Sequence, residues 1–217
     1  MLQLHYFPST ASMVPHILLE ETGAPYEQVL VDRTHDVQKS TAYLRLNPNG
    51  LIPVLTDGDL VLYETAAIAL YLCDSFPRSA LAPAVGTPER AHFYKWLMWL
   101  TNTLQATLIV YFYPERWVKA GNVSAVAEVK AHAEWRTRVL LDQLESEWAR
   151  HGGPWMLGEA YSALDAYVFT LCRWTRGFAL TPPARERPHL GAFLHRMLER
   201  PAVQRALANE GLSAPFF

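Results

Sequence analysis

The first 76 residues alternate between strand-like and helix-like hydrophobic spacing, and this order constrains the fold more than any other feature of the chain. The expected elements are a strand, a helix, a strand, an irregular helix, a hairpin and a helix, at residues 2–6, 13–22, 26–31, 34–46, 53–63 and 64–76. Gly23 ends the first helix, and Asp57-Gly58-Asp59 between two apolar runs is a hairpin signature. These elements predict a small α/β domain.

A change of composition separates this part from the rest of the chain. Residues 77–88 contain three prolines and no sustained hydrophobic period, which is typical of a linker. Beyond it only helical spacing occurs, at residues 88–111, 124–149, 162–174, 188–199 and 201–208. We therefore predict a small α/β domain at 1–78, a linker at 79–88 and an all-α domain at 89–217.

Composition and charge exclude several classes of protein. The 217 residues are 50% hydrophobic, which excludes a disordered chain. Nineteen basic and 21 acidic residues leave a net charge of −2, so nothing favours nucleic acid or an anionic membrane as a partner. Two isolated cysteines give no metal-ligand spacing. No signal peptide pattern and no apolar run of about 18 residues occur, so we expect a cytoplasmic protein.

The stretch NPNGLIPVL, residues 47–55, places a proline directly before a hairpin strand. A trans Pro53 inside the sheet would remove a ladder donor. A cis Ile52–Pro53 bond would instead turn the chain and present the Ile52 N–H and C=O to an extended peptide ligand. From these residues alone an ordinary trans turn is the alternative, since only about 5–6% of such bonds are cis.

The stretch YETAAIALYL, residues 63–72, places Glu64 and Thr65 where a strand meets the N-terminus of a helix. Free N–H groups there attract an anion, and the Thr65 hydroxyl can add a donor. Glu64 can accept from an ammonium group, so the pair suits the head of an amino acid. The alternative is N-capping by Thr65 beside a favourable acidic residue.

The stretch SALD, from Ser162 to Asp165, has the spacing of a capping box and begins an apolar helix. We assign it a structural role. These three motifs, in this order and with the linker between the second and the third, resemble the glutathione S-transferase family over nearly the whole chain. They are similar to that family's cis-proline loop, its Glu-Ser/Thr-x-Ala-Ile segment and its helix N-capping box.

The resemblance implies a thioredoxin-like N-terminal domain, an all-α C-terminal domain and usually a homodimer. It also implies a cis peptide bond before Pro53. Glutathione would be the co-substrate, without a metal. Ile52 and Pro53 would then hold its cysteinyl part, and Glu64 and Thr65 its γ-glutamyl end. His35 lies where the family often contacts the glycyl carboxylate, although a solvated histidine is the alternative.

In this family a hydroxyl or a cysteine after the first strand stabilises the glutathione thiolate, helped by the N-terminus of the first helix. Counting back from the helix end favours Ser9, and counting forward from Pro8 favours Thr10. Ser12 is the more natural helix N-cap. We rank Ser9 first, before Ser12 and Thr10.

Two further positions bear on this choice. The cysteine of bacterial beta-type members would fall at Ala11, so the chain resembles a serine-type member or a beta-like one without the cysteine. Tyr6 matches the tyrosine-type members, but its alternation puts it in the sheet, and it ranks last. Cys73 and Cys172 lie in apolar helical patterns and are predicted to be buried and inert.

The aromatic stretch 111–117 follows the first helix of the helical domain. By resemblance, a small hydrophobic electrophile would bind near it, between the domains, although core packing accounts for most of these residues. The resulting function is a glutathione transferase, with glutathione peroxidase activity as a side reaction of the same site. The alternative is a glutathione-binding or protein-interaction module with little catalysis.

Overall fold

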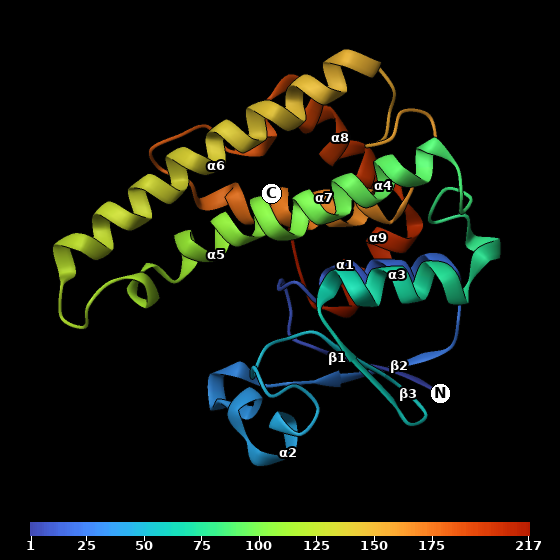
Figure 1. Ribbon diagram of the computed structural model, residues 1–217, viewed down its shortest axis with the longest axis horizontal. Helices are drawn as coiled ribbons and strands as arrows, with labels where there is room; N and C mark the ends of the chain where they lie inside the picture. Colours follow the sequence, from blue (N-terminus) through green and yellow to red (C-terminus); the bar gives the residue numbers. More distant parts are fainter. The chain divides into compact units, whose positions relative to one another are not determined.

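The computed structural model describes residues 1–217, which form two compact units (Figure 1). Unit 1 comprises Met1–Pro83 together with Leu198–Phe216, and unit 2 comprises Ala84–Met197 with Phe217. Composition does not indicate that the C-terminal segment belongs with the sheet, because its helix resembles any other amphipathic helix. The domain ranges 1–78, 79–88 and 89–217 stay a prediction.

Unit 1 contains a four-stranded mixed sheet. Its strands are β1 (Leu2–Tyr6), β2 (Tyr26–Leu30), β3 (Val54–Asp57) and β4 (Leu60–Tyr63), in the order β2-β1-β3-β4. β1 and β2 run parallel, whereas β3 is antiparallel to both β1 and β4. The α/β prediction for this part of the chain is confirmed, and the tight connection between β3 and β4 is the predicted hairpin.

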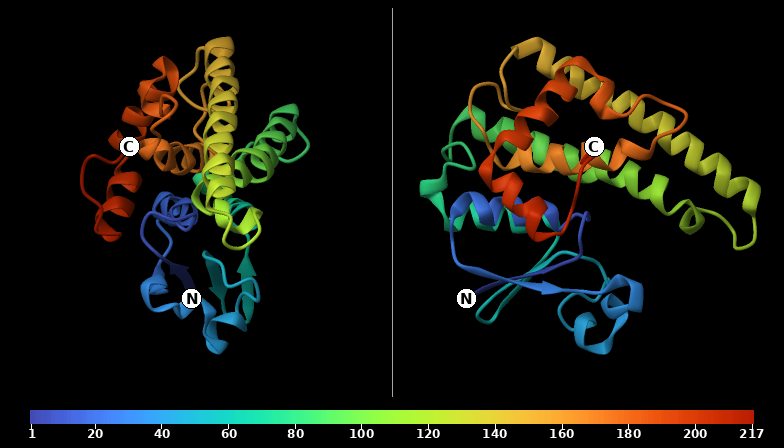
Figure 2. Two further views of the ribbon diagram at one scale, coloured as in Figure 1. Left: turned by 90° about the vertical axis from the view of Figure 1, so that its left-hand side faces the viewer. Right: turned by 180° about the vertical axis from the view of Figure 1, so that it is seen from behind.

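Two helices lie side by side over one face of this sheet, α1 (Met13–Thr22) and α3 (Thr65–Ser75) (Figures 1 and 2). Their fully buried side chains include Ile17, Leu18, Ile68 and Leu72. α1 ends at Gly23 as predicted, because the residue there has φ 65°, in the left-handed region that favours glycine. A third helix, α9 (Pro201–Asn209), packs against α1.

The chain between β2 and β3 is irregular, as expected. It forms 3₁₀ turns at Arg33–His35 and Val37–Lys39 and the short helix α2 (Thr41–Leu44). Tyr43 of α2 joins a small buried cluster with Val31 and Val54, against which Ile52 also packs. This cluster ties the irregular segment to the start of β3.

Unit 2 is entirely helical. Its helices are α4 (Pro88–Trp99), α5 (Ala106–Phe112), α6 (Val123–His151) and α7 (Ala163–Trp174), and α8 (Pro188–Glu199) begins in it. Shorter 3₁₀ turns of this unit lie at Pro114–Trp117, Thr175–Gly177 and Ala184–Glu186, and Pro77–Ser79 of unit 1 forms another. α5 packs along α6 (Figure 2). Every residue of α7 is buried, as predicted for the apolar helix 162–174.

One feature of unit 2 differs from the sequence-based expectation of a single helix over 88–111. A π-helical turn, Leu100–Gln105, joins α4 to α5. Both Thr101 and Gln105 in this turn hydrogen-bond to the hydroxyl of buried Tyr167. Local periodicity does not distinguish such a turn from a continuous α-helix.

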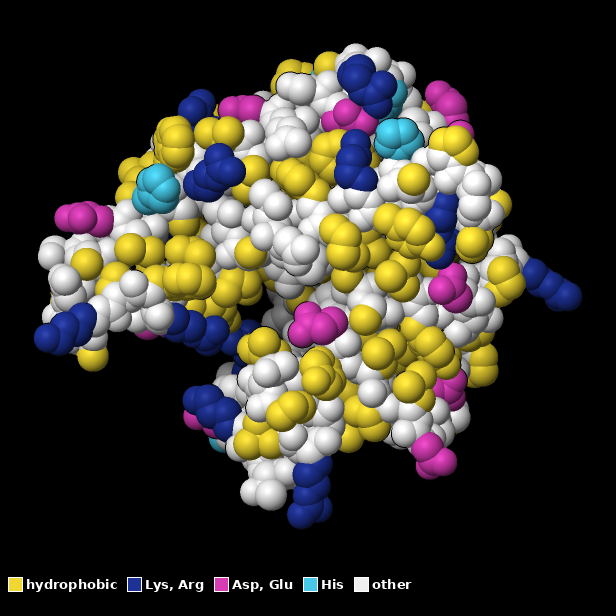
Figure 3. Space-filling model, in the orientation of Figure 1, with side chains coloured by type: hydrophobic (Ala, Val, Ile, Leu, Met, Phe, Trp, Pro, Cys, Tyr) yellow, Lys and Arg dark blue, Asp and Glu magenta, His cyan; other side chains and the backbone are white.

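The distribution of charged side chains and the burial of both cysteines agree with the expectations from the sequence. On the face shown in Figure 3, positive and negative side chains are interspersed. Cys73 and Cys172 are both buried free thiols, and burial raises the pKa of Cys172 to about 12. Although α6 has 29 residues, no helix combines the length and the apolar character needed to cross a membrane.

The capping box at the start of α7 is confirmed. Asp165 Oδ2 accepts from the Ser162 N–H at 2.8 Å, and the Ser162 hydroxyl accepts from the Leu164 N–H at 3.3 Å. Asp165 Oδ1 also accepts from the Met156 N–H at 2.8 Å, so one buried carboxylate joins the helix to the loop before it.

We expect Asp165→Ala to lower the free energy of unfolding by about 3 kcal/mol, since it removes a cap and leaves two buried N–H groups without their acceptor. Urea titration followed by tryptophan fluorescence measures this loss. Asp59→Ala, at the exposed hairpin turn, is the control and should change stability by less than about 0.5 kcal/mol. Equal losses in the two variants would contradict a special role for the buried carboxylate.

Candidate functional site

The ends of four strands meet at one edge of the sheet in unit 1. His5 of β1 pairs with Val54 of β3, and Val54 pairs with Tyr63 of β4. Tyr6 pairs with Leu30, the last residue of β2. The segments that begin or end at this edge carry every predicted site residue, at 7–12, 32–53 and 64–65. The topology therefore brings together groups that are up to about 55 positions apart in the sequence.

The β1–α1 loop binds its own backbone through two hydroxyls. Thr10 Oγ1 donates to the Phe7 carbonyl at 2.8 Å, and Ser12 Oγ donates to the same carbonyl at 3.1 Å. Ser12 is fully buried, whereas Thr10 is half-buried. Ser12 occupies the N-cap position of α1 as predicted, but its hydroxyl caps no helix N–H, because it bonds to Phe7 instead.

Ser9 adopts an unusual backbone conformation in the same loop. Its φ is 62°, in the left-handed region that non-glycine residues rarely adopt. Its N–H donates to Oε2 of Glu210 at 2.7 Å. The side chain of Glu210 is fully buried, and it reaches Ser9 from the end of α9. The C-terminal segment thus holds the loop that carries the first-ranked hydroxyl.

The same carboxylate also binds a buried histidine. Glu210 Oε1 lies 2.9 Å from Nδ1 of His16, whose side chain is fully buried in α1. The other ring nitrogen of His16 lies 3.0 Å from the side-chain amide of Gln28 on β2. This network was not predicted from the sequence. Its only signal was a histidine within the apolar pattern of 13–22, because Glu210 is 194 positions away from His16.

The predicted cis Ile52–Pro53 bond is confirmed. Ile52 is half-buried and lies outside the β3 ladder, which begins at Val54. Its N–H and C=O are therefore not used by the sheet and remain open to a ligand that runs alongside.

The N-terminus of α3 lacks a side-chain cap. Glu64, with φ 73° and ψ 114°, occupies the N-cap position, so the alternative of N-capping by Thr65 is wrong. Thr65 is the first helical residue and is buried. Within the helix, the first backbone bond runs from the Ile68 N–H to the Glu64 carbonyl at 3.0 Å. The preceding N–H groups therefore have no intrahelical acceptor, which is the arrangement that attracts an anion.

His35 follows β2 but is held by its own segment. Its Nδ1 lies 2.6 Å from Oδ2 of Asp32, and its side chain is 80% exposed. Hydrogen bonds from Thr34 and His35 lower the pKa of Asp32 to about 2. The contact of His35 with a ligand stays a prediction.

The aromatic stretch of unit 2 divides into buried and exposed members. Tyr111 is buried and packs on Phe178, with ring centroids 4.7 Å apart. Phe112 is 43% exposed and Trp117 is 63% exposed. Tyr111 therefore has the core role that was the alternative, while two aromatic side chains present surface to solvent.

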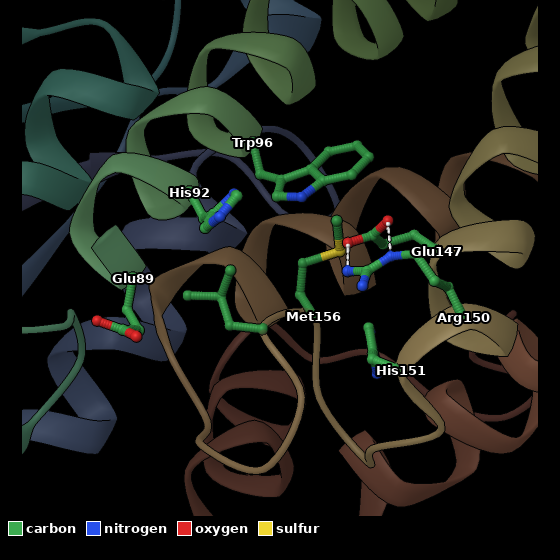
Figure 4. A pocket seen from close by; sticks show the side chains of 8 residues that line it. Glu89, His92, Trp96, Glu147, Arg150, His151 and Met156 are labelled. Carbon is green, nitrogen blue, oxygen red and sulfur yellow. Dashed lines mark hydrogen bonds and ion pairs between the residues drawn. The ribbon is translucent and has the colours of Figure 1, made fainter. Parts of the chain in front are cut away.

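A separate cavity of about 110 Å³ lies within unit 2 (Figure 4). Trp96 and Met156 form apolar walls, and Glu147 binds Arg150 through two hydrogen bonds of 2.6 and 3.1 Å. Burial lowers the pKa of His151, which also lines it. Glu147 and Arg150 thus neutralise each other's charge, whereas the N–H groups at the sheet edge of unit 1 have no such partner in the helix.

We expect Glu210→Ala to lower the free energy of unfolding by about 3 kcal/mol, because it leaves the Ser9 N–H and buried His16 without their acceptor. Glu199→Ala removes an exposed carboxylate nearby in the sequence and is the control. Urea titration compares the two variants. A decrease of less than about 1 kcal/mol in the free energy of unfolding of Glu210→Ala would contradict a large contribution of this carboxylate to stability.

Comparison with known proteins agrees with this geometry. Residues 2–74 match the glutathione S-transferase N-terminal domain, and residues 101–201 match the C-terminal domain. The chain is 32% identical to glutathione S-transferase GstA of Escherichia coli O157:H7, over 97% of this chain and all of that protein.

Solved structures extend the similarity. A glutathione transferase homologue from Sulfitobacter with bound glutathione superimposes with a TM-score of 0.87 at 29% identity, covering 98% of this chain and 99% of its own. A sphingomonad glutathione S-transferase complexed with glutathione gives 0.81 at 34% identity, covering 97% and 100%. The chain therefore belongs to the glutathione S-transferase family.

Proposed function

We propose that this protein is a glutathione transferase whose glutathione site is the sheet edge of unit 1. The observation that carries the proposal is the meeting, at that edge, of an open backbone segment at Ile52, an uncapped helix N-terminus at Thr65 and the hydroxyl-bearing loop 7–12. Glutathione offers a matching peptide group, a carboxylate and a thiol. The similar proteins from Sulfitobacter and a sphingomonad bind glutathione, which supports the same ligand for this protein.

Each end of the tripeptide has a partner of suitable chemistry. The N–H and C=O of Ile52 pair with the cysteinyl backbone, as in strand addition, with Pro53 beside them. The N–H groups at the start of α3 and the Thr65 hydroxyl bind the γ-glutamyl carboxylate. The Glu64 carboxylate accepts from its ammonium group. His35 contacts the glycyl carboxylate from the 3₁₀ turn after β2.

Ser9 is the hydroxyl that we assign to the thiol. Thr10 and Ser12 both donate to the Phe7 carbonyl, whereas the backbone of Ser9 is fixed by Glu210 at the start of the same loop, which supports the first-ranked serine. A donor at the sulfur stabilises the thiolate over the thiol. Lowering the pKa of a thiol by about two units requires about 2.7 kcal/mol of differential stabilisation. One charge-assisted hydrogen bond together with the N-terminus of α1 is of that order.

The thiolate then attacks an electrophilic carbon of a small hydrophobic substrate, and the leaving group departs with the bonding electron pair. Holding both reactants supplies the remaining catalysis by proximity. Exposed Phe112 and Trp117 offer aromatic surface for such a substrate. We also propose a homodimer, which the exposed apolar pair Tyr94 and Met98 on α4 supports.

We expect Ser9→Ala to raise the pKa of bound glutathione by about two units and to lower kcat/KM about 100-fold at neutral pH. The Kd for glutathione should change little, because the backbone contacts remain. Ultraviolet thiolate absorbance across a pH series measures the pKa. Ser12→Ala and Thr10→Ala are the matched controls, and an equal or larger effect in either would transfer the role to that residue.

A glutathione-binding module with little catalysis is the second candidate, favoured by Ala11 where beta-type members have cysteine. It predicts that the wild-type protein binds glutathione without lowering the pKa of its thiol. The same absorbance titration therefore separates the two functions.

A further inference from the structure

Two buried side chains in the segment before β3 donate to one carbonyl. Tyr43 Oη donates to the Leu51 carbonyl oxygen at 2.8 Å, and Asn47 Nδ2 donates to the same oxygen at 2.9 Å. Tyr43 is 4% exposed and Asn47 is 3% exposed, whereas Leu51 itself is 53% exposed. The Leu51 side chain thus does not anchor the loop, and the two hydrogen bonds hold the backbone instead.

The bonded carbonyl belongs to the same peptide group as the Ile52 N–H. That peptide is trans, since the cis bond is the following one, Ile52–Pro53. In a planar trans peptide the C=O and N–H vectors point in opposite directions. Two donors that fix the Leu51 C=O toward the protein interior therefore aim the Ile52 N–H away from it. They also polarise the peptide group and make that N–H a stronger donor.

Each of the two donors is itself held in place. The Tyr43 ring packs in the cluster with Val31 and Val54. The backbone N–H of Tyr43 donates to the Ser40 hydroxyl at 3.2 Å. The ring of His5 meets it edge-on, with centroids 6.3 Å apart. The Tyr43 hydroxyl is thus pre-oriented, and forming its hydrogen bond costs little conformational entropy.

Asn47 closes the turn from both sides. Its Oδ1 accepts from the Asn49 N–H at 3.0 Å, and its carbonyl accepts from the Gly50 N–H at 2.9 Å. Gly50 has φ 64°, and a Cβ there would lie 3.1 Å from the Gln38 carbonyl. This asparagine and this glycine therefore stabilise the observed conformation of the loop.

We infer that Tyr43 and Asn47 are positioning residues for glutathione, which act by aiming the Ile52 N–H at the cysteinyl part of the tripeptide. This inference rests on the proposed glutathione site. Neither side chain touches the ligand. Their effect falls on the affinity for glutathione and not on the ionisation of its thiol.

The test compares two tyrosines of unit 1 that each lose only a hydroxyl. Tyr43→Phe removes one of the two bonds to Leu51. Tyr71→Phe removes a hydroxyl that donates to Asp57 at 2.8 Å, and Asp57 lies at the opposite end of β3 from the site. Calorimetric titration gives the Kd for glutathione and for S-methylglutathione, and steady-state kinetics give KM and kcat.

We expect Tyr43→Phe to raise the Kd for both ligands about fivefold, the typical worth of one net hydrogen bond, and Tyr71→Phe to change it by less than about twofold. The KM for glutathione should rise in parallel. The kcat at saturating glutathione and the pKa of the bound thiol should stay unchanged in both variants. A structural defect alone would not reproduce this separation of KM from kcat.

Asn47→Asp provides the second variant. The aspartate keeps an acceptor for the Asn49 N–H, but it loses the donor and sets a negative charge against the Leu51 oxygen. It should therefore raise the Kd more than Tyr43→Phe does, by about tenfold or more. Equal Kd values for wild type, Tyr43→Phe and Asn47→Asp would overturn the inference while leaving the transferase intact. No binding of glutathione to the wild-type protein would overturn the proposed function and this inference with it.

Discussion

The pairing of β3 with both of its neighbours is the constraint on which the rest of unit 1 depends. Val54 is bonded in register to β1 on one side and to β4 on the other, so the chain must leave all three strands at the same edge. The open peptide at Ile52 and the uncapped start of α3 are close together for this reason. A shift of one residue in either ladder would turn the buried Val54 outward and separate these groups.

A second interaction links this edge to the far end of the chain. Glu210 binds the Ser9 N–H and His16 with one buried carboxylate, 201 and 194 positions away. Ion pairs from Arg200 to Glu21 and from Arg205 to Glu20 hold the same C-terminal segment on α1. The loop that carries Ser9 is therefore held by tertiary contacts, which explains how a serine keeps a positive φ without glycine in that place.

Local features of this fold were predictable from the sequence, and distant ones were not. Gly23, Gly58 and the Ser162–Asp165 box mark their elements because cause and effect lie within a few residues of each other. The cis Ile52–Pro53 bond needed the family resemblance, since proline alone favours the trans form. Glu210 was missed because a single acidic residue near a helix end gives no periodic signal.

In the candidate site too, contiguous motifs were predictable from the sequence, whereas competition between hydrogen-bond partners was not. Ile52, Glu64 and Thr65 were predicted as ligand contacts because their motifs are contiguous, and that role stays a prediction. The Ile52 peptide lies outside the β3 ladder, and the N–H groups before Ile68 have no intrahelical acceptor. Ser12 occupies the predicted N-cap position, but its hydroxyl donates to the Phe7 carbonyl and caps no helix N–H. N-capping by Thr65, the alternative, was wrong, because Glu64 occupies the N-cap of α3. Competition between nearby partners is decided by geometry, which the order of residues does not contain.

The sheet edge of unit 1 is proposed to bind glutathione and to favour its thiolate. Calorimetric titration of the wild-type protein with glutathione, in two buffers of different ionisation enthalpy, measures affinity and proton release together. We expect saturable binding with a fraction of a proton released at neutral pH, because a thiol that ionises on binding loses its proton to the buffer. Binding with the same heat in both buffers would contradict thiol activation, and the absence of binding would contradict the site itself.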